Sequence, residues 1–250
     1  MKLISHRRYM LILSALFLLY WAVLAIHPSD RPTWLLENML VFGFVAAIAS
    51  SYRGFPLSRV SYTLIFVFLC LHTIGAHYTY AKVPYDTWFQ SAFGSGLNQM
   101  LGFERNHFDR LVHFCYGFLM AYPVREIFVR IVNVRGFWGY FLPLDLTLSS
   151  SAFFELIEWG VAVIFGGDMG TAYLGTQGDE WDAQKDMGLA ALGALIAMSI
   201  TFAINAYMRR DFANELAQSL RVKHPHPLDE STFNRTPRAK RRKRQSVSSS

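Results

Sequence analysis

Six mostly apolar stretches, each near the length of a membrane span, dominate this sequence. They cover roughly residues 9–26, 34–52, 60–78, 108–128, 138–165 and 186–208. A helix needs about 20 apolar residues to cross a bilayer, and within lipid only helices or closed barrels satisfy their own backbone hydrogen bonds. Only 17% of the residues are charged and 52% are hydrophobic, which is unusual for a soluble domain. We therefore expect an all-α, polytopic membrane helix bundle with about six transmembrane helices.

Two of these stretches allow a second interpretation. The stretch 138–165 is long, and Pro143 near its start suggests a kink or a short re-entrant segment before the span. The first stretch follows Arg7 and Arg8, as in a cleaved signal peptide. Its length, and the lack of a small-residue cleavage site after Ile26, favour a membrane span instead.

The distribution of lysine and arginine predicts that both termini are cytoplasmic. With that orientation, 19 of the 24 basic residues face the cytoplasm, as the positive-inside rule requires. The other five fall outside, and they are Arg31, Lys82, Arg105, Arg110 and Lys185. The prediction is therefore of a multi-pass membrane protein with both of its termini on the cytoplasmic side.

The sequence divides into a transmembrane domain, 1–208, and a basic tail, 209–250. The tail carries 11 basic and 4 acidic residues, a net charge of +7, whereas residues 1–208 carry −1, so the basicity of the chain lies in the tail. Its cluster Lys240–Arg244 is followed by Gln and Ser residues, which favours a disordered cytoplasmic segment that binds anionic lipids. A solvated extension, or a targeting or RNA-binding patch, are the alternatives. The transmembrane domain itself is not expected to bind nucleic acid.

The outer loop 79–107 is rich in aromatic residues. Trp88, Phe89, Phe93 and Phe103 are typical of a segment at the membrane–water interface. We expect an interfacial helix from about 85 to 101. It would serve as an anchor, or as a lid over the outer end of the bundle.

Glu155 and Glu158 lie within an otherwise apolar span. Three residues apart on a helix, they share one face, and each costs on the order of 3 kcal/mol near hydrocarbon. The predicted topology brings further polar groups to the same outer end. These are His72, His77, Asp109, His113, Asp179, Asp182 and Asp186, from three other segments. Ionisable residues from several spans at one depth predict a functional site.

These residue types suit a divalent cation or acid–base chemistry. Glu158, Asp182, Asp186 and His113 are candidate metal ligands, because carboxylate oxygen and imidazole nitrogen bind such ions. Glu155, Glu158, His113 and Asp109 are candidate catalytic residues, since neighbouring carboxylates provide both an acid and a base. No established metal signature is present. The structural alternative is a network in which Arg105 and Arg110 neutralise two of the carboxylates.

Three motifs carry a resemblance to a known family. They are Arg105-Asn-His-Phe-Asp109-Arg-Leu-Val-His113, Glu155-Leu-Ile-Glu158-Trp159, and the segment 173–186 with Gln177-Gly-Asp179-Glu-Trp-Asp182. Over roughly residues 9–208 the chain resembles the YjdF-like family of bacterial inner-membrane proteins. The resemblance implies a multi-span inner-membrane protein and no particular reaction.

A fainter resemblance is to VanZ-like proteins. In those proteins an Asp and a His begin one span, as Asp109 and His113 do here. Their last span begins with Asp and is rich in Gly and Ala, which is similar to the span that begins at Asp182. This sequence departs from the pattern at Ala190, where an Asn is expected, and lacks the Arg before Asp182.

Three functions follow from these observations. The first is a membrane-embedded enzyme that acts on a lipid-linked or amphiphilic substrate at the outer face. The second is a scaffold or binding protein that holds partners by its acidic loops and basic tail. The third is a transporter with the Glu pair as proton carriers, although the charges lie at one face and no inverted repeat is evident.

Overall fold

The computed structural model describes residues 4–167, 170, 174–209 and 212–223. Packing divides the chain into two units, Met1–Ser219 and Leu220–Ser250, and the account below concerns the first. The cluster Lys240–Arg244 lies outside the described residues. Its binding of anionic lipids stays a prediction, as does the domain boundary after residue 208.

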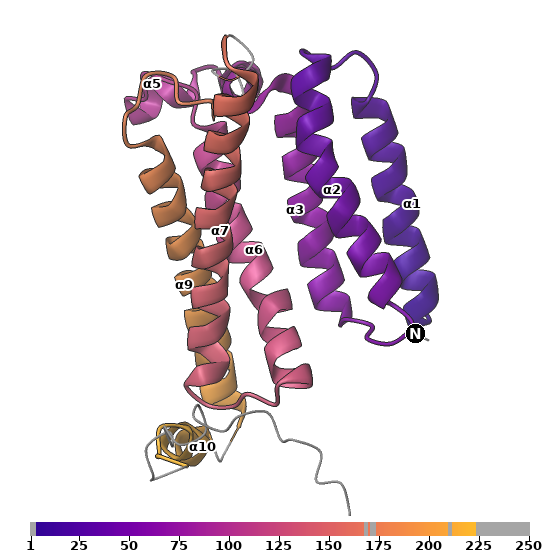
Figure 1. Ribbon diagram of the computed structural model, residues 1–250, viewed down its shortest axis with the longest axis vertical. Helices are drawn as coiled ribbons and strands as arrows, with labels where there is room; N and C mark the ends of the chain where they lie inside the picture. Colours follow the sequence, from indigo (N-terminus) through magenta and orange to yellow (C-terminus); the bar gives the residue numbers. More distant parts are fainter. Residues whose placement is uncertain (1–3, 168–169, 171–173, 210–211, 224–250) are drawn as a thin grey trace, which may run out of the picture. The chain divides into compact units, whose positions relative to one another are not determined.

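Six long helices coincide with the six predicted spans (Figure 1). They are α1 (His6–Leu24), α2 (Arg31–Ser51), α3 (Arg59–Tyr78), α6 (Phe108–Ile131), α7 (Trp138–Phe165) and α9 (Asp182–Met208). Short elements follow α3 and α9: η1 (Tyr80–Lys82), α4 (Tyr85–Phe93), α5 (Leu97–Leu101) and α10 (Phe212–Ser219). In the described part of the chain, five helices, α1, α2, α3, α7 and α9, are long and apolar enough to cross a membrane. The predicted all-α membrane helix bundle is confirmed.

The remaining long helix, α6, is less apolar than the other five. His113, Arg125 and Glu126 interrupt its hydrophobic sequence. Its 24 residues correspond to about 36 Å at 1.5 Å per residue, enough to span the hydrocarbon core. It packs against α3, α7 and α9, where His113 is buried and Glu126 accepts a hydrogen bond from the Ser61 hydroxyl of α3.

Short polar residues fix where the first three helices begin. The side chains of Ser5, Asp30 and Ser58 accept hydrogen bonds from backbone N–H groups in the first turns of α1, α2 and α3. Such caps satisfy donors that a helix start leaves without partners. In contrast to the suggested re-entrant segment, α7 is a continuous helix through Pro143. Pro143 is only the sixth residue of α7, so it removes just one of its first backbone hydrogen bonds.

The helices alternate in direction along the chain (Figure 1). The last turns of α1, α3 and α7 and the first turns of α2, α6 and α9 therefore lie at one end of the bundle, called here the site end. The start of α1 and the end of α9 lie at the opposite end. This agrees with termini on one side of the membrane, while the assignment of that side to the cytoplasm stays a prediction.

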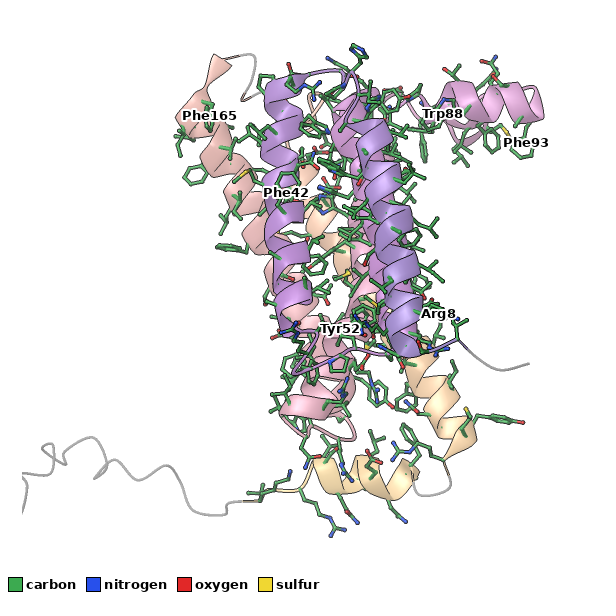
Figure 2. All side chains as sticks on the ribbon, turned by 90° about the vertical axis from the view of Figure 1, so that its right-hand side faces the viewer. Arg8, Phe42, Tyr52, Trp88, Phe93 and Phe165 are labelled. Atoms are coloured by element: carbon green, nitrogen blue, oxygen red, sulfur yellow. The ribbon has the colours of Figure 1, made fainter. Side chains whose placement is uncertain are left out.

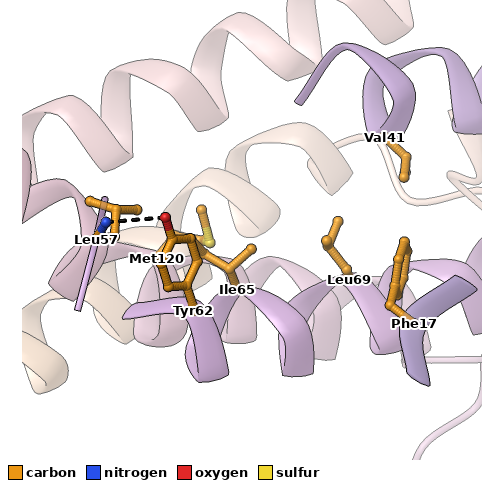
Figure 3. Close-up of a cluster of buried hydrophobic side chains, with 7 residues drawn as sticks. All are labelled: Phe17, Val41, Leu57, Tyr62, Ile65, Leu69 and Met120. Carbon is orange, nitrogen blue, oxygen red and sulfur yellow. Dashed lines mark hydrogen bonds between the residues drawn. The ribbon is translucent and has the colours of Figure 1, made fainter. Parts of the chain in front are cut away.

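A hydrophobic cluster joins α1, α2 and α3 to α6 (Figure 3). It contains Phe17, Val41, Leu57, Tyr62, Ile65, Leu69 and Met120. The Tyr62 hydroxyl also accepts a hydrogen bond of 3.1 Å from the Leu57 backbone N–H. Lipid is as apolar as these side chains, so their close packing, rather than escape from water, stabilises the contact.

The closest helix contact is between α6 and α9. A Cβ atom at Gly117 would lie 1.8 Å from the Ala190 carbonyl oxygen, and one at Gly193 would lie 2.2 Å from the Phe114 carbonyl oxygen. Ala190 and Ala194 are fully buried there. Small residues therefore let the two backbones touch, as is common between helices in membranes.

The loop after α3 contains two short helices where the sequence predicted one. Gly94 ends α4 with φ +85°, a left-handed conformation that glycine adopts readily. Asp86 then accepts a 2.7 Å hydrogen bond from the Asn98 backbone N–H, which holds α5 against α4. Figure 2 shows α4 projecting beside the bundle at the site end, with Trp88 and Phe93 exposed.

Helix α10 lies in the segment that the sequence analysis assigned to the tail, but it packs against the long helices of the first unit. Phe212 is buried against the rings of Tyr140 and Phe202. Ser219 accepts a 2.9 Å hydrogen bond from the Phe137 backbone N–H. By packing, the first unit therefore extends to Ser219.

We predict that an added methyl group at the α6–α9 contact destabilises the protein. Gly117→Ala and Gly193→Ala are each expected to lower the free energy of unfolding by roughly 1–3 kcal/mol, the usual cost of overpacking. Gly188→Ala and Gly160→Ala are matched controls, because nothing lies within 4 Å of a Cβ at either position. Thermal unfolding in detergent measures the difference, and equal melting temperatures for both pairs would contradict the contact.

We also predict that α4 lies in the outer membrane interface. In a background of Cys70→Ala and Cys115→Ala, a fluorophore on Phe93→Cys should be blue-shifted and quenched by nitroxide lipids, since an amphipathic helix buries its apolar face in the headgroup region. The same fluorophore on Ser91→Cys, an exposed position on nearly the opposite face of α4, should report water. Equal exposure to water at both positions would place α4 away from the bilayer.

Candidate functional site

Asp109, His113 and Asp186 meet at the site end. Asp109 and His113 are one turn apart on α6, with His113 Nε2 3.7 Å from Asp109 Oδ1. Asp186 comes from α9, across the close contact made by Gly117 and Gly193. One potential ligand atom of each residue lies within 4.8 Å of the other two. His113 and Asp186 are buried and Asp109 nearly so.

The Glu155–Glu158 pair of α7 borders these three residues. Glu155 Oε1 is 3.5 Å from His113 Nε2, and Glu158 lies three residues further along α7, on the same face of the helix. Glu158 is buried. Its charge interacts with those of Asp109 and Asp186. The sequence analysis expected polar groups from α3, α6, α7 and α9 at this end. Those of α6, α7 and α9 lie together here, whereas His72 and His77 of α3 bond to the backbone carbonyls of Glu37 and Leu24.

Glu37 on α2 is a member of the cluster that the sequence analysis missed. It is only 2% exposed, and its charge interacts with those of Asp109 and Glu158. One signal was available, because Glu37 is the only charged residue in the apolar stretch 34–52. It lies just three residues after the start of that stretch, where an acidic residue is commonly a helix N-terminal charge.

Asp182 is engaged differently, in a network of ion pairs. Arg105 Nη1 lies 2.8 Å from Asp182 Oδ1 and 3.5 Å from Asp179 Oδ2. Arg110 pairs with the same two carboxylates. The alternative in which these arginines neutralise two carboxylates therefore holds for Asp179 and Asp182, and not for the other acidic residues.

The loop before α9 fixes this network in place. The side-chain amide of Gln177 accepts a 3.0 Å hydrogen bond from the Asn106 backbone N–H and donates one of 3.0 Å to the Asn106 carbonyl. Hydrogen bonds from the Lys185 ammonium hold the pKa of Asp179 well below its usual range. Burial, together with the nearby arginines, lowers the pKa of His107, so this imidazole is neutral at pH 7.

An open hollow of about 690 Å³ adjoins the network on its loop side. It is lined by residues 102–105, His107 and residues 177–181. Arg105 and Asp179 belong both to the hollow and to the ion pairs. The site end therefore has two layers. The first lies beside this hollow and contains the carboxylates that Arg105 and Arg110 neutralise, Asp179 and Asp182. The second contains the buried carboxylates of Glu37, Asp109, Glu155, Glu158 and Asp186.

The second layer has oxygen atoms that no hydrogen bond satisfies. Within the described residues, buried Glu37 Oε2, Glu155 Oε1 and Asp186 Oδ1 have no hydrogen-bond partner. Burying a carboxylate without a partner costs several kcal/mol. A cation among these oxygens would remove that cost. Chemically, the arrangement offers three ligand-type groups and an adjacent pair of carboxyl groups.

Asp182 is predicted to stabilise the fold through its ion pairs. Asp182→Asn should lower the free energy of unfolding by roughly 1–3 kcal/mol, because Arg105 loses the nearer of its two carboxylates and both arginines then share Asp179 alone. Lys185→Gln removes a half-exposed partner of Asp179 and should change little. Thermal unfolding of the two variants tests this, and a similar small effect of both would show that the network is unimportant for stability.

Comparisons with known proteins agree with this architecture. The family model described as "Predicted membrane protein (DUF2238)" matches residues 9–207. "Inner membrane protein YjdF" of Escherichia coli (strain K12) is 41% identical over 181 residues, which cover 72% of this chain and 81% of that protein. No solved structure shows significant similarity to the chain. The predicted YjdF-like resemblance and the multi-pass membrane location are confirmed, and the chain belongs to the DUF2238 family of predicted membrane proteins.

Proposed function

We propose that the protein is a membrane-embedded enzyme that uses a divalent cation at the outer face of the inner membrane. The observation that carries this proposal is the approach of Asp109, His113 and Asp186, whose ligand atoms lie within 4.8 Å of one another. The sequence analysis proposed Glu158, Asp182, Asp186 and His113 as ligands of the cation. The geometry supports His113 and Asp186, and favours Asp109 over Asp182, which Arg105 already engages.

The donor set and its surroundings support catalysis. Two carboxylates and an imidazole suit Mg²⁺, Mn²⁺ or Zn²⁺. Such an ion polarises a phosphoryl or carbonyl oxygen and lowers the pKa of bound water. Glu155 and Glu158 are the carboxyl groups next to these ligands along α7, where one could donate a proton and the other accept one.

The position of the site supports an amphiphilic or lipid-linked substrate. On α7, Leu156 and Trp159 are 61% and 63% exposed, next in sequence to Glu155 and Glu158. An apolar chain can therefore approach from the lipid side. A polar head group can reach the same end of the bundle from the water side, where the hollow beside Arg105 and Asp179 lies. Hydrophilic substrates would use only the second route.

Metal content is the first test of this proposal. Purified wild-type protein should retain a divalent cation in a near-stoichiometric amount, measured by elemental analysis. Asp186→Asn and His113→Gln should lose it, because each removes one of three ligands. Asp182→Asn should keep it, and so should Asp145→Asn, which changes an exposed carboxylate of α7 outside the cluster.

Turnover is the second part of the same test. The protein in nanodiscs of bacterial lipid extract should change at least one lipid species, seen by mass spectrometry. EDTA or Asp186→Asn should abolish the change. A protein that binds the cation but alters no lipid would argue against an enzyme, and a folded wild type that binds no divalent cation would sink the proposal.

A further inference from the structure

The end of the bundle opposite the site end carries Arg125 inside the long helix α6 (Figure 1). Arg125 lies six residues before Ile131, where α6 ends, which is roughly 9 Å along the axis at 1.5 Å per residue. Within the described residues it has no acidic partner and no side-chain hydrogen bond, and its Nε atom is buried without an acceptor. Charged side chains within a span are usually paired with an opposite charge or a polar group. Arg125 therefore lacks the counter-charge that its position requires.

The guanidinium group of Arg125 is held in place by the ring of Tyr140. Its central carbon lies 4.8 Å from the centre of that ring, a distance at which a cation and an aromatic face attract each other. Tyr140 belongs to α7 and is fixed in turn, because its hydroxyl accepts a 2.9 Å hydrogen bond from the side-chain amide of Asn205 on α9. Its ring also contacts those of Phe202 and Phe212. Three long helices thus set the position of this cation.

The donors at this position suit the oxygen atoms of a phosphate group. A guanidinium group presents its N–H donors in a planar fork that matches phosphate. The Tyr140 hydroxyl accepts from its neighbour, so its own proton remains available to an acceptor. Two acidic residues at this end, Glu126 and Glu215, are already paired with Arg130 and Arg209. A bound anion would supply the missing charge.

The surroundings of Tyr140 favour an anion that carries apolar chains. Phe137, Trp138 and Phe141 lie next to it at the start of α7, and all three rings are exposed. Trp138 also donates from Nε1 to the Ser219 carbonyl oxygen at 3.0 Å. Aromatic side chains of this kind gather at the level of the lipid head groups. Phospholipid phosphates lie at the same level, with acyl chains that would cover the exposed rings.

We infer that Arg125, together with Tyr140, binds the phosphate group of a phospholipid at the end of the bundle opposite the candidate functional site. Basic pockets between membrane helices hold lipid head groups in this way. The bound lipid neutralises the guanidinium group and stabilises the contact among α6, α7 and α9. The inference is independent of the proposed function, because it requires neither a divalent cation nor turnover.

Thermal unfolding of the full-length protein in detergent, after removal of bound lipid, tests this inference. The probe is dihexanoyl-phosphatidylcholine, which has a phosphate group but no net charge, so the basic tail does not attract it. The lipid should raise the melting temperature of the wild type by about 2–4 °C. Arg125→Gln should lose this shift. The matched control, Arg53→Gln, removes an exposed arginine at the same end and should keep it.

Two further probes separate the phosphate group from the chains. Dihexanoylglycerol, which has the same chains without the phosphate, should give no shift. Inorganic phosphate at the same concentration should give a smaller shift than the lipid. Should Arg125→Gln fail to fold, Arg125→Met replaces it with the same expected loss, because it keeps an unbranched apolar stem on the Tyr140 ring.

The results that would overturn the inference are equally specific. Equal shifts in the wild type and the folded Arg125 variant would show that the lipid binds elsewhere. A shift with dihexanoylglycerol as large as that with the phospholipid would show that the phosphate group is not recognised. An equal shift with inorganic phosphate would indicate an anion site without a lipid. None of these results bears on the cation proposed at Asp109, His113 and Asp186.

Discussion

The backbone contact between α6 and α9 is the constraint on which the rest of the site depends. Gly117 and Gly193 remove the side chains that would otherwise separate the two helices. Only then can Asp186 reach the turn of α6 that carries Asp109 and His113. The same approach places Asp182 opposite Arg105. Packing of small residues in the middle of the bundle thus sets the geometry of charged residues at its end.

Charge compensation divides the site end into two parts with different chemistry. Beside the hollow, Arg105 and Arg110 balance Asp179 and Asp182, so these carboxylates need no ligand. Deeper in the bundle, buried carboxylates outnumber the imidazole of His113. A buried charge without compensation is retained only where something is gained from it. In the proposed function the deeper part is the reactive one, and the arginine layer stabilises the loop beside it.

Hydropathy was sufficient to predict the helices, because the length of a span is set by the bilayer. Helical periodicity placed Asp109 beside His113, and Glu155 beside Glu158. It could not separate Asp182 from Asp186, since both lie on one face of α9 and only the position of Arg105 distinguishes them. Glu37 was missed because the groups it interacts with come from α3, α6 and α7, far away in sequence. The break at Gly94 depends on one left-handed residue inside an otherwise helical pattern.

The order of these helices along the chain has a consequence for biosynthesis. Glu37 lies in the second long helix and Asp186 in the sixth, so no fragment that lacks either helix contains the whole cluster. During insertion, Asp109, Glu155 and Glu158 enter the membrane before α9 exists to complete the cluster. Arg105 and Arg110 likewise precede their acidic partners. The site is therefore assembled only after translation of the last span, and until then its acidic residues remain in an incomplete bundle.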